Sequence, residues 1–120
     1  MHDDPFGANR LCVARELEDV GYDGVYTFEG RHDPFLPLAV AAGSTSRLKL
    51  ATGIAVAFAR NPMLLANLGY DLQLMSGGRF MFGIGPGGLP SDSEMFGDLS
   101  PPERGKRMVE AVTTIQHIWA

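Results

Sequence analysis

The sequence contains a single cysteine, so no disulfide can form within the chain. Cys12 lies among apolar residues, and no cysteine or histidine stands near it at the spacing of a metal site. These features predict a reducing compartment, the cytoplasm, in which Cys12 is a small core residue. They offer no ligand set for a metal ion.

Positive charge and long apolar runs are also scarce. Lysine and arginine number 10 against 14 aspartates and glutamates, and no basic stripe could follow a phosphate backbone. No apolar run is long enough to cross a bilayer, and the first residues, "MHDDPFGANR", lack the apolar core of a signal peptide. The sequence therefore predicts neither a nucleic-acid partner nor a membrane association.

What the sequence does contain is typical of one soluble globular domain over residues 1–120, of which 45% are hydrophobic. Aromatic and β-branched runs, or nearly continuous apolar ones, predict three strands, at 22–29, 48–58 and 79–85. Apolar residues at helical spacing predict helices over 8–20, 63–75 and 100–119, and a shorter helix that begins near Asp33-Pro34. The interior Gly53 marks a bulge or a close backbone approach.

The predicted ends of the helices rest on capping residues. Gly21, Gly43 and the triplet Ser76-Gly77-Gly78 are placed to end helices, and Asn61-Pro62 is placed to begin one. Ser100-Pro101-Pro102-Glu103 matches a capping box ahead of the last helix.

Alternating helices and strands at this spacing predict an α/β fold with parallel strands and right-handed crossovers. Two architectures fit that order: a doubly wound open sheet, or an arc of a (β/α)8 TIM barrel. Three strands cannot close a barrel, which typically needs about 250 residues, so the second architecture implies a partial barrel.

The stretch "SGGRFMFGIGPGG" spells G-x-G-x-x-G with Gly83, Gly85 and Gly88. A dinucleotide-binding turn needs a helix that begins at the last glycine, but the next helix signal comes only at Ser100. Two other interpretations stay open: glycines that permit a tight exit from a buried strand, or a strand-end backbone that closely approaches a ring or a phosphate.

Residues unlike those of ordinary turns follow each predicted strand. The carboxyl ends of parallel strands lie on the same face, so these residues are expected to be neighbours. The first strand is followed by Glu29, Arg31 and His32. The second carries Gly53-Ile54 and is followed by Arg60-Asn61, of which the first is most simply an exposed charge and the second an N-cap. The third leads into the glycine loop, with Ser91 and Asp92 beyond it.

Three longer strings resemble the bacterial luciferase-like family of flavin- or deazaflavin-dependent oxidoreductases. They are "GYDGVYTFEGRHDPFLPLAVAA", "LKLATGIAVAFARNPMLLANLGYDLQLMSGGRF" and the "GIG" that ends the next strand. The resemblance is nearest to the branch that uses coenzyme F-420, and it extends over about residues 12–85. It implies a (β/α)8 barrel with the cofactor on the C-terminal face, of which this chain would be the first part.

The resemblance also implies roles for particular residues. Gly53-Ile54 matches a bulge whose non-proline cis peptide supports the flavin-type ring, and Gly83 and Gly85 would lie beside the ring. Glu29 matches a strand-end acid near the ring and the substrate, and its alternative is a solvated loop carboxylate. His32 would be a proton donor, since histidine titrates near neutral pH, or else a cap for the following helix.

Asp71 and Arg79, a pair that the family also shows, are expected to form a salt bridge between helix and strand. The loop 86–99 departs from the F-420 branch and is unassigned.

The leading hypothesis is a fragment of an oxidoreductase that transfers a hydride through coenzyme F-420, with an FMN-dependent monooxygenase as the second choice and a small molecule as substrate. One alternative is a non-catalytic remnant or assembly piece, which would pair with a second copy or a complementary half-barrel. The other is a small doubly wound nucleotide-binding domain.

Overall fold

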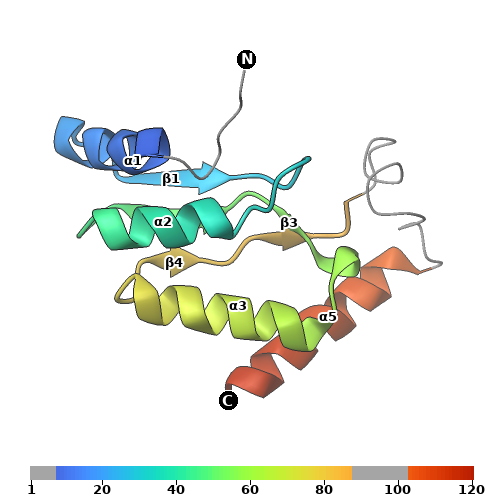
Figure 1. Cartoon of the computed structure of the whole chain (residues 1–120). Coiled ribbons are helices and arrows are strands. Elements are labelled where there is room, and N and C mark those ends of the chain that lie inside the picture. The colour runs from blue at the N-terminus through green and yellow to red at the C-terminus, as the bar shows by residue number, and fades with distance from the viewer. Residues whose placement is uncertain (1–7, 88–102) are drawn as a thin grey trace.

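The structure is a computed structural model that describes residues 8–87 and 103–120. It is an α/β fold in which parallel strands alternate with helices, as the sequence predicted (Figure 1). The elements in chain order are α1 (Ala8–Val20), β1 (Gly24–Thr27), α2 (Leu36–Ser44), β2 (Lys49–Thr52), β3 (Ala55–Val56), the 3-10 turn η1 (Ala57–Ala59), α3 (Pro62–Met75), β4 (Phe80–Met81), β5 (Ile84–Gly85) and α5 (Arg104–Trp119).

Two of the three predicted strands are each divided into two shorter ones. The predicted strand 48–58 becomes β2 and β3, separated at Gly53-Ile54, and the strand 79–85 becomes β4 and β5. β1, β2 and β4 form one parallel sheet in that order, and β3 pairs with β5 in parallel beyond it. Strands that follow one another in the sequence are therefore neighbours in space, and all their carboxyl ends face the same side.

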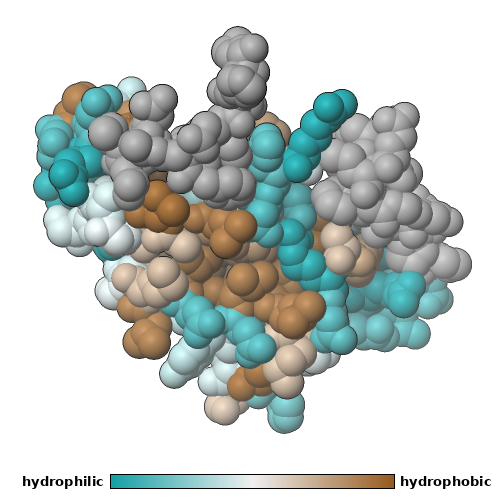
Figure 2. Space-filling model, viewed as in Figure 1, coloured by the Kyte–Doolittle hydropathy of each residue, from teal (hydrophilic) through white to brown (hydrophobic). Residues whose placement is uncertain are grey.

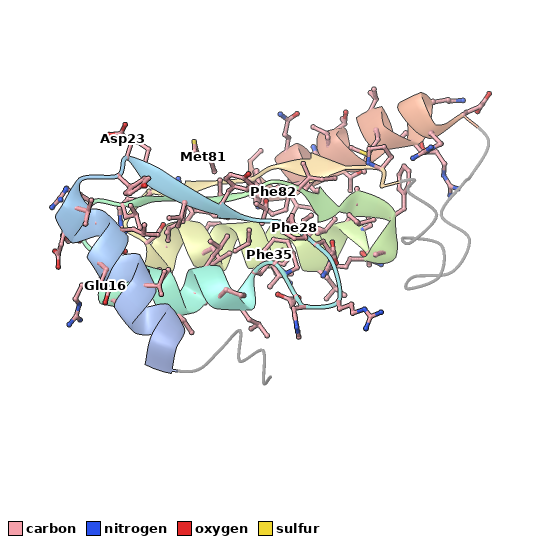
Figure 3. All side chains as sticks on the ribbon, turned by 90° about the horizontal axis from the view of Figure 1, so that it is seen from above. Glu16, Asp23, Phe28, Phe35, Met81 and Phe82 are labelled. Carbon is pink, nitrogen blue, oxygen red and sulfur yellow. The ribbon has the colours of Figure 1, made fainter. Side chains whose placement is uncertain are left out.

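The core lies between these strands and the helices α2 and α3. Leu48 and Leu50 from β2 and its approach, Leu38 from α2 and Leu65 from α3 are at most 1% exposed. Phe82 lies 5.8 Å from Phe35 and 5.9 Å from Trp119 between ring centroids, which joins α5 to the same core. Side chains alternate between the two faces along each strand. On the other face of the sheet the exposed Met81 points away from α2 and α3 (Figure 3).

Most helix ends follow the predicted capping residues. Gly21 ends α1 with φ of 104°, and the amides of Gly21 and Tyr22 both donate to the carbonyl of Leu17. Asn61 caps α3, its side chain accepting from the Met63 amide at 2.8 Å. Asp33 caps the entry to α2, since its Oδ1 accepts from the Phe35 and Leu36 amides at 2.7 and 2.9 Å.

The end of α2 corrects two predictions. Gly43 lies inside the helix, which continues to Ser44. Arg79 does not pair with Asp71: its guanidinium donates to the carbonyls of Ala42, Thr45, Leu48 and Ser76, at 3.1, 3.1, 2.8 and 2.6 Å. These carbonyls, at the ends of α2 and α3 and in the loop that enters β2, need donors, and one arginine supplies them. No ion pair in the described residues includes Asp71.

Glu18 is a buried carboxylate that the sequence analysis did not single out. It is 6% exposed, and it accepts from the amides of Ser46, Arg47 and Leu48 at 2.7–3.1 Å, which ties α1 to the loop that enters β2. The hydrogen bond from the Arg47 amide, together with those from Ser46 and Leu48, overcomes the effect of burial and lowers the pKa of Glu18 to about 2.

The outer surface of the helices is partly apolar. Figure 2 shows hydrophobic residues gathered in the middle of the face that carries α2 and α3. Leu36 on α2 and Met63 and Leu64 on α3 are each more than half exposed. Within the described ranges, none of the helices combines the length and the apolar character that a membrane crossing requires.

Several predictions made from the sequence fall outside the described residues. They are the core position of the Cys12 side chain, Gly88 as the last glycine of the motif, Ser91 and Asp92, most of the loop 86–99, and the first three residues of the proposed capping box. The last of that box, Glu103, has φ of 60° and makes no side-chain cap hydrogen bond to α5.

We predict that Glu18→Gln destabilises the chain at neutral pH and flattens its acid response. The pKa of Glu18 is about 2 in the folded state against an ordinary 4.5, so its stabilisation is complete above pH 4.5 and is lost as the pH falls toward 2. Urea unfolding followed by circular dichroism between pH 2 and 7 measures this. Glu16→Gln, on the exposed side of α1, is the control; equal pH dependence of Glu18→Gln and wild type would contradict the prediction.

Candidate functional site

The candidate site lies where the carboxyl ends of β1, β2 and β4 meet. The Gly53 amide donates to the Thr27 carbonyl at 2.6 Å, and the Glu29 amide donates to the Ile54 carbonyl at 3.0 Å. The Ala55 amide donates to the Gly83 carbonyl at 2.9 Å. The structure thus brings together the three strand ends that the sequence analysis expected to be neighbours.

At the centre of this surface lies Gly53-Ile54. The peptide bond that joins these residues is cis, as the family resemblance implied. Both residues are exposed, Ile54 by 40%, and the ring of Tyr26, itself 71% exposed, lies beside Gly53. Backbone and apolar side chains of this segment are therefore exposed on the face of the sheet opposite α2 and α3.

Gly83 permits the closest approach of two neighbouring strands in the site. The hydroxyl of Thr52 donates to the Gly83 carbonyl at 2.7 Å and accepts from the Gly83 amide at 2.9 Å. A side-chain carbon at Gly83 would fall well inside 3.0 Å of the Thr52 carbonyl oxygen. Close packing, one of the open interpretations of the glycine motif, thus accounts for this residue.

Gly85 is buried under Ile54. A side-chain carbon added at Gly85 would overlap Cδ1 of Ile54 at well under 3.0 Å. The two described glycines of the motif therefore support the Gly53-Ile54 segment from the neighbouring strand. The next described helix begins only at Arg104.

Glu29 is neither solvated nor open to the surface. Its side chain is 2% exposed, and its Oε1 pairs with Nη2 of Arg60 at 2.6 Å. Its other oxygen, Oε2, accepts a hydrogen bond from the Val56 amide. Both carboxylate oxygens are thus engaged by groups of the neighbouring strand and the loop that follows it.

Arg60 corrects the expectation of an exposed charge, because its side chain is only 17% exposed. Besides Glu29, its Nη2 contacts Oδ2 of Asp33 at 3.3 Å, and its guanidinium lies 5.2 Å above the centre of the Phe35 ring. Burial acts to lower the pKa of Arg60, but the hydrogen bond and charge of Glu29, with those of Asp33, raise it above its usual value. The sequence signal that could have found this pairing is the presence of two acids, Glu29 and Asp33, at the neighbouring strand end.

His32 lies on the exposed part of the same loop, beside the exposed Arg31. The capping of α2 that was one alternative for His32 is performed by Asp33. No group of three or more histidine, cysteine, aspartate or glutamate side chains within the described residues is placed to hold a metal ion.

Comparison with known proteins gives a family match over most of the chain. The model of the luciferase-like monooxygenase family matches residues 8–120. An uncharacterized protein of Mycobacterium tuberculosis is 50% identical over 93% of this chain and 33% of its own length. A putative coenzyme F-420-dependent oxidoreductase of the same species is 33% identical over 93% of this chain and 32% of its own length.

A solved structure shares the fold. The oxygenating constituent of 3,6-diketocamphane monooxygenase from Pseudomonas putida, a type II Baeyer-Villiger monooxygenase in complex with FMN, superimposes with a TM-score of 0.80. It is 25% identical, and the match covers 94% of this chain and 35% of that one. The chain thus spans about a third of the length of the curated relatives it matches.

We predict that Gly83→Ala is strongly destabilising, by more than about 3 kcal/mol, because the added methyl group meets a backbone carbonyl that cannot move without breaking the strand pairing. Gly85→Ala costs less, roughly 1–3 kcal/mol, because the flexible end of Ile54 can turn aside. Gly43→Ala, inside α2 with nothing nearby, is the control and should stabilise by about 0.5–1 kcal/mol. Denaturant unfolding gives all three values, and the reverse order at positions 83 and 85 would refute the packing role of Gly83.

Proposed function

Because the chain belongs to the luciferase-like monooxygenase family, we propose that it forms the ring-binding part of a TIM-barrel oxidoreductase. The proposed cofactor is coenzyme F-420, with FMN as the second choice. The relative named as a putative coenzyme F-420-dependent oxidoreductase supports the first cofactor, and the FMN-bound structural neighbour supports the second. Residues 1–120 would contribute one partial barrel domain, and the substrate would be a small molecule.

The strand-end surface fits a flat ring. Gly53 is exposed and has no side chain beside the Tyr26 ring, and Ile54 and Tyr26 add exposed apolar area around it. In this proposal Gly53 and Ile54 contact the ring, while Gly83 and Gly85 hold that segment in place from below. When bound, the deazaflavin or flavin supplies the hydride or oxygen chemistry, and the protein supplies orientation and proton exchange.

His32 is the better placed of the two proposed proton-exchange groups. It is exposed on the loop that follows β1, whereas the side chain of Glu29 is 2% exposed. Histidine is also the commonest general acid or base near neutral pH. The proposal therefore assigns proton exchange with the substrate or the ring to His32.

A second candidate role, assembly, is favoured by the uncovered face of the sheet. Tyr26 and Met81 are 71% and 53% exposed on the face that Met81 marks in Figure 3, and Ile54 is 40% exposed. Parallel sheets are almost always covered on both faces. We propose that this face pairs with complementary barrel units or with a second copy of the chain.

For the first role, we expect the isolated 120 residues to bind FMN or coenzyme F-420 only weakly, with a Kd on the order of a millimolar. The reason is that TIM barrels take their phosphate site from the loops after strands seven and eight, and the chain matches about a third of its relatives. Fluorescence titration measures the Kd, and tight binding by the isolated chain would contradict this expectation.

The same cofactors can be tested in a chimera in which residues 8–120 replace the matching third of the 50% identical M. tuberculosis relative. The chimera is expected to bind one cofactor saturably, and His32→Asn should lower turnover while leaving cofactor binding intact. The unaltered relative is the control. A folded chimera that binds neither cofactor, while the unaltered relative binds one of them, would contradict the proposed function.

For the second role, we expect the isolated chain to self-associate in size-exclusion chromatography with light scattering. Replacing Met81 with lysine should shift it toward the monomer, because the charge would lie on the face proposed to be covered. Val109→Lys, at another apolar position that is more than half exposed, on α5, is the control. A wild-type chain that stays monomeric at high concentration would argue against this role.

A further inference from the structure

Glu29 holds the Ile54–Val56 segment at both of its ends. The Glu29 amide donates to the Ile54 carbonyl at 3.0 Å, and the Glu29 carboxylate accepts from the Val56 amide. Backbone and side chain of one residue therefore grip two residues that flank Ala55. This segment directly follows Gly53 on the strand-end surface.

The opposite edge of the same segment, which contains β3, pairs with β5. Ala55 is in register with Ile84, Val56 with Gly85, and the Ala55 amide donates to the Gly83 carbonyl. Ile54–Val56 is thus fixed between Glu29 on one side and β5 on the other. Removal of the Glu29 contact would release one edge of the segment.

Arg60 holds the Glu29 carboxylate in this position. The guanidinium joins Glu29 to Asp33, whose other oxygen caps the entry to α2, and it is covered by the ring of Phe35. One partly buried cation thereby connects the loop after β1, the entry to α2 and the chain leading into α3. A carboxylate held at both oxygens is oriented, not free to turn toward a ligand.

From these contacts we propose that Glu29 is a positioning residue: with Arg60, its carboxylate fixes the Ile54–Val56 segment, of which the exposed Ile54 contacts the cofactor ring, and it does not exchange protons. The inference rests on the proposed function for the presence of the ring, but the fixing of the segment can be measured without any cofactor. Glu29 acts on the ring through Ile54, while proton exchange falls to His32.

The test uses the 120-residue chain and two readouts. The first is hydrogen exchange of the Val56 amide by NMR, with the Leu50 amide, which donates to the Arg79 carbonyl at 3.0 Å in the sheet, as the internal reference. Glu29→Gln keeps the size of the side chain and removes its charge. Relative to Leu50, exchange at Val56 should become roughly 10- to 100-fold faster, the range for a hydrogen bond to a charged group.

The second readout is the chemical-shift response of Ile54 and Ala55 to millimolar FMN and, separately, to coenzyme F-420. The apparent Kd should rise at least about fivefold in Glu29→Gln. The matched control is Glu18→Gln, because Glu18 is also a buried carboxylate that accepts from backbone amides, but at the entry to β2. Glu18→Gln should lower overall stability and leave both the Val56 exchange ratio and the ligand response unchanged.

A third variant tests whether Glu29 and Arg60 act as one unit. Arg60→Met should also speed Val56 exchange, and the double variant Glu29→Gln/Arg60→Met should be no worse than the more affected single variant, since the two residues act as one unit. Val56 protection that is unaltered in Glu29→Gln would overturn the positioning role. A wild-type chain whose Ile54–Val56 amides respond to neither cofactor would instead defeat the proposed function, and the ring-positioning role with it.

Discussion

The close approach of Thr52, at the end of β2, to Gly83, between β4 and β5, is the contact on which the candidate site depends. The Thr52 hydroxyl bonds both the amide and the carbonyl of Gly83, just where the pairing passes from β2 with β4 to β3 with β5. A side chain at position 83 has no room there. This junction lets the chain turn at Gly53-Ile54 and still resume pairing at Ala55. Gly53 and Ile54 therefore lie exposed at the carboxyl ends of the strands, while the Gly53 amide and the Ile54 carbonyl stay bonded to β1 and the loop after it.

Two buried carboxylates secure the ends of the same strands by one chemical device. Glu18 accepts from the amides that lead into β2, and Glu29 accepts from the amide of Val56 beyond it. The difference lies in their countercharges. Glu18 is satisfied mainly by backbone dipoles, whereas Glu29 carries a buried arginine that also reaches Asp33. The amino end of the strands is thus held by a carboxylate that accepts from backbone amides and the Ser46 hydroxyl, and the carboxyl end by an ion pair among the loops where TIM barrels place their active sites.

Membership in the luciferase-like monooxygenase family resolves the choice between the two architectures that the order of elements left open. Three sequential parallel strands also begin a doubly wound sheet, and their pairing alone does not separate the two. The match over residues 8–120, together with the superposition on a monooxygenase, places the chain in the luciferase-like fold. The chain spans about a third of the length of its relatives, and Tyr26 and Met81 are more than half exposed on the face of the sheet opposite α2 and α3.

The sequence by itself determined the class of fold, the number of strand-helix units and most helix ends. Those features follow from local periodicity and from capping by residues such as Asn61 and Gly21, which act within a few positions of themselves. It also indicated, through a resemblance, that Gly53-Ile54 was special. Only the tertiary structure decided the partners of charged residues, because those partners lie far away in the chain: Arg79 donates to carbonyls at the end of α2 and not to Asp71, and Arg60 pairs with Glu29. For the same reason the role of the glycine motif could not be decided from the sequence, since the space around Gly83 is set by Thr52 on another strand.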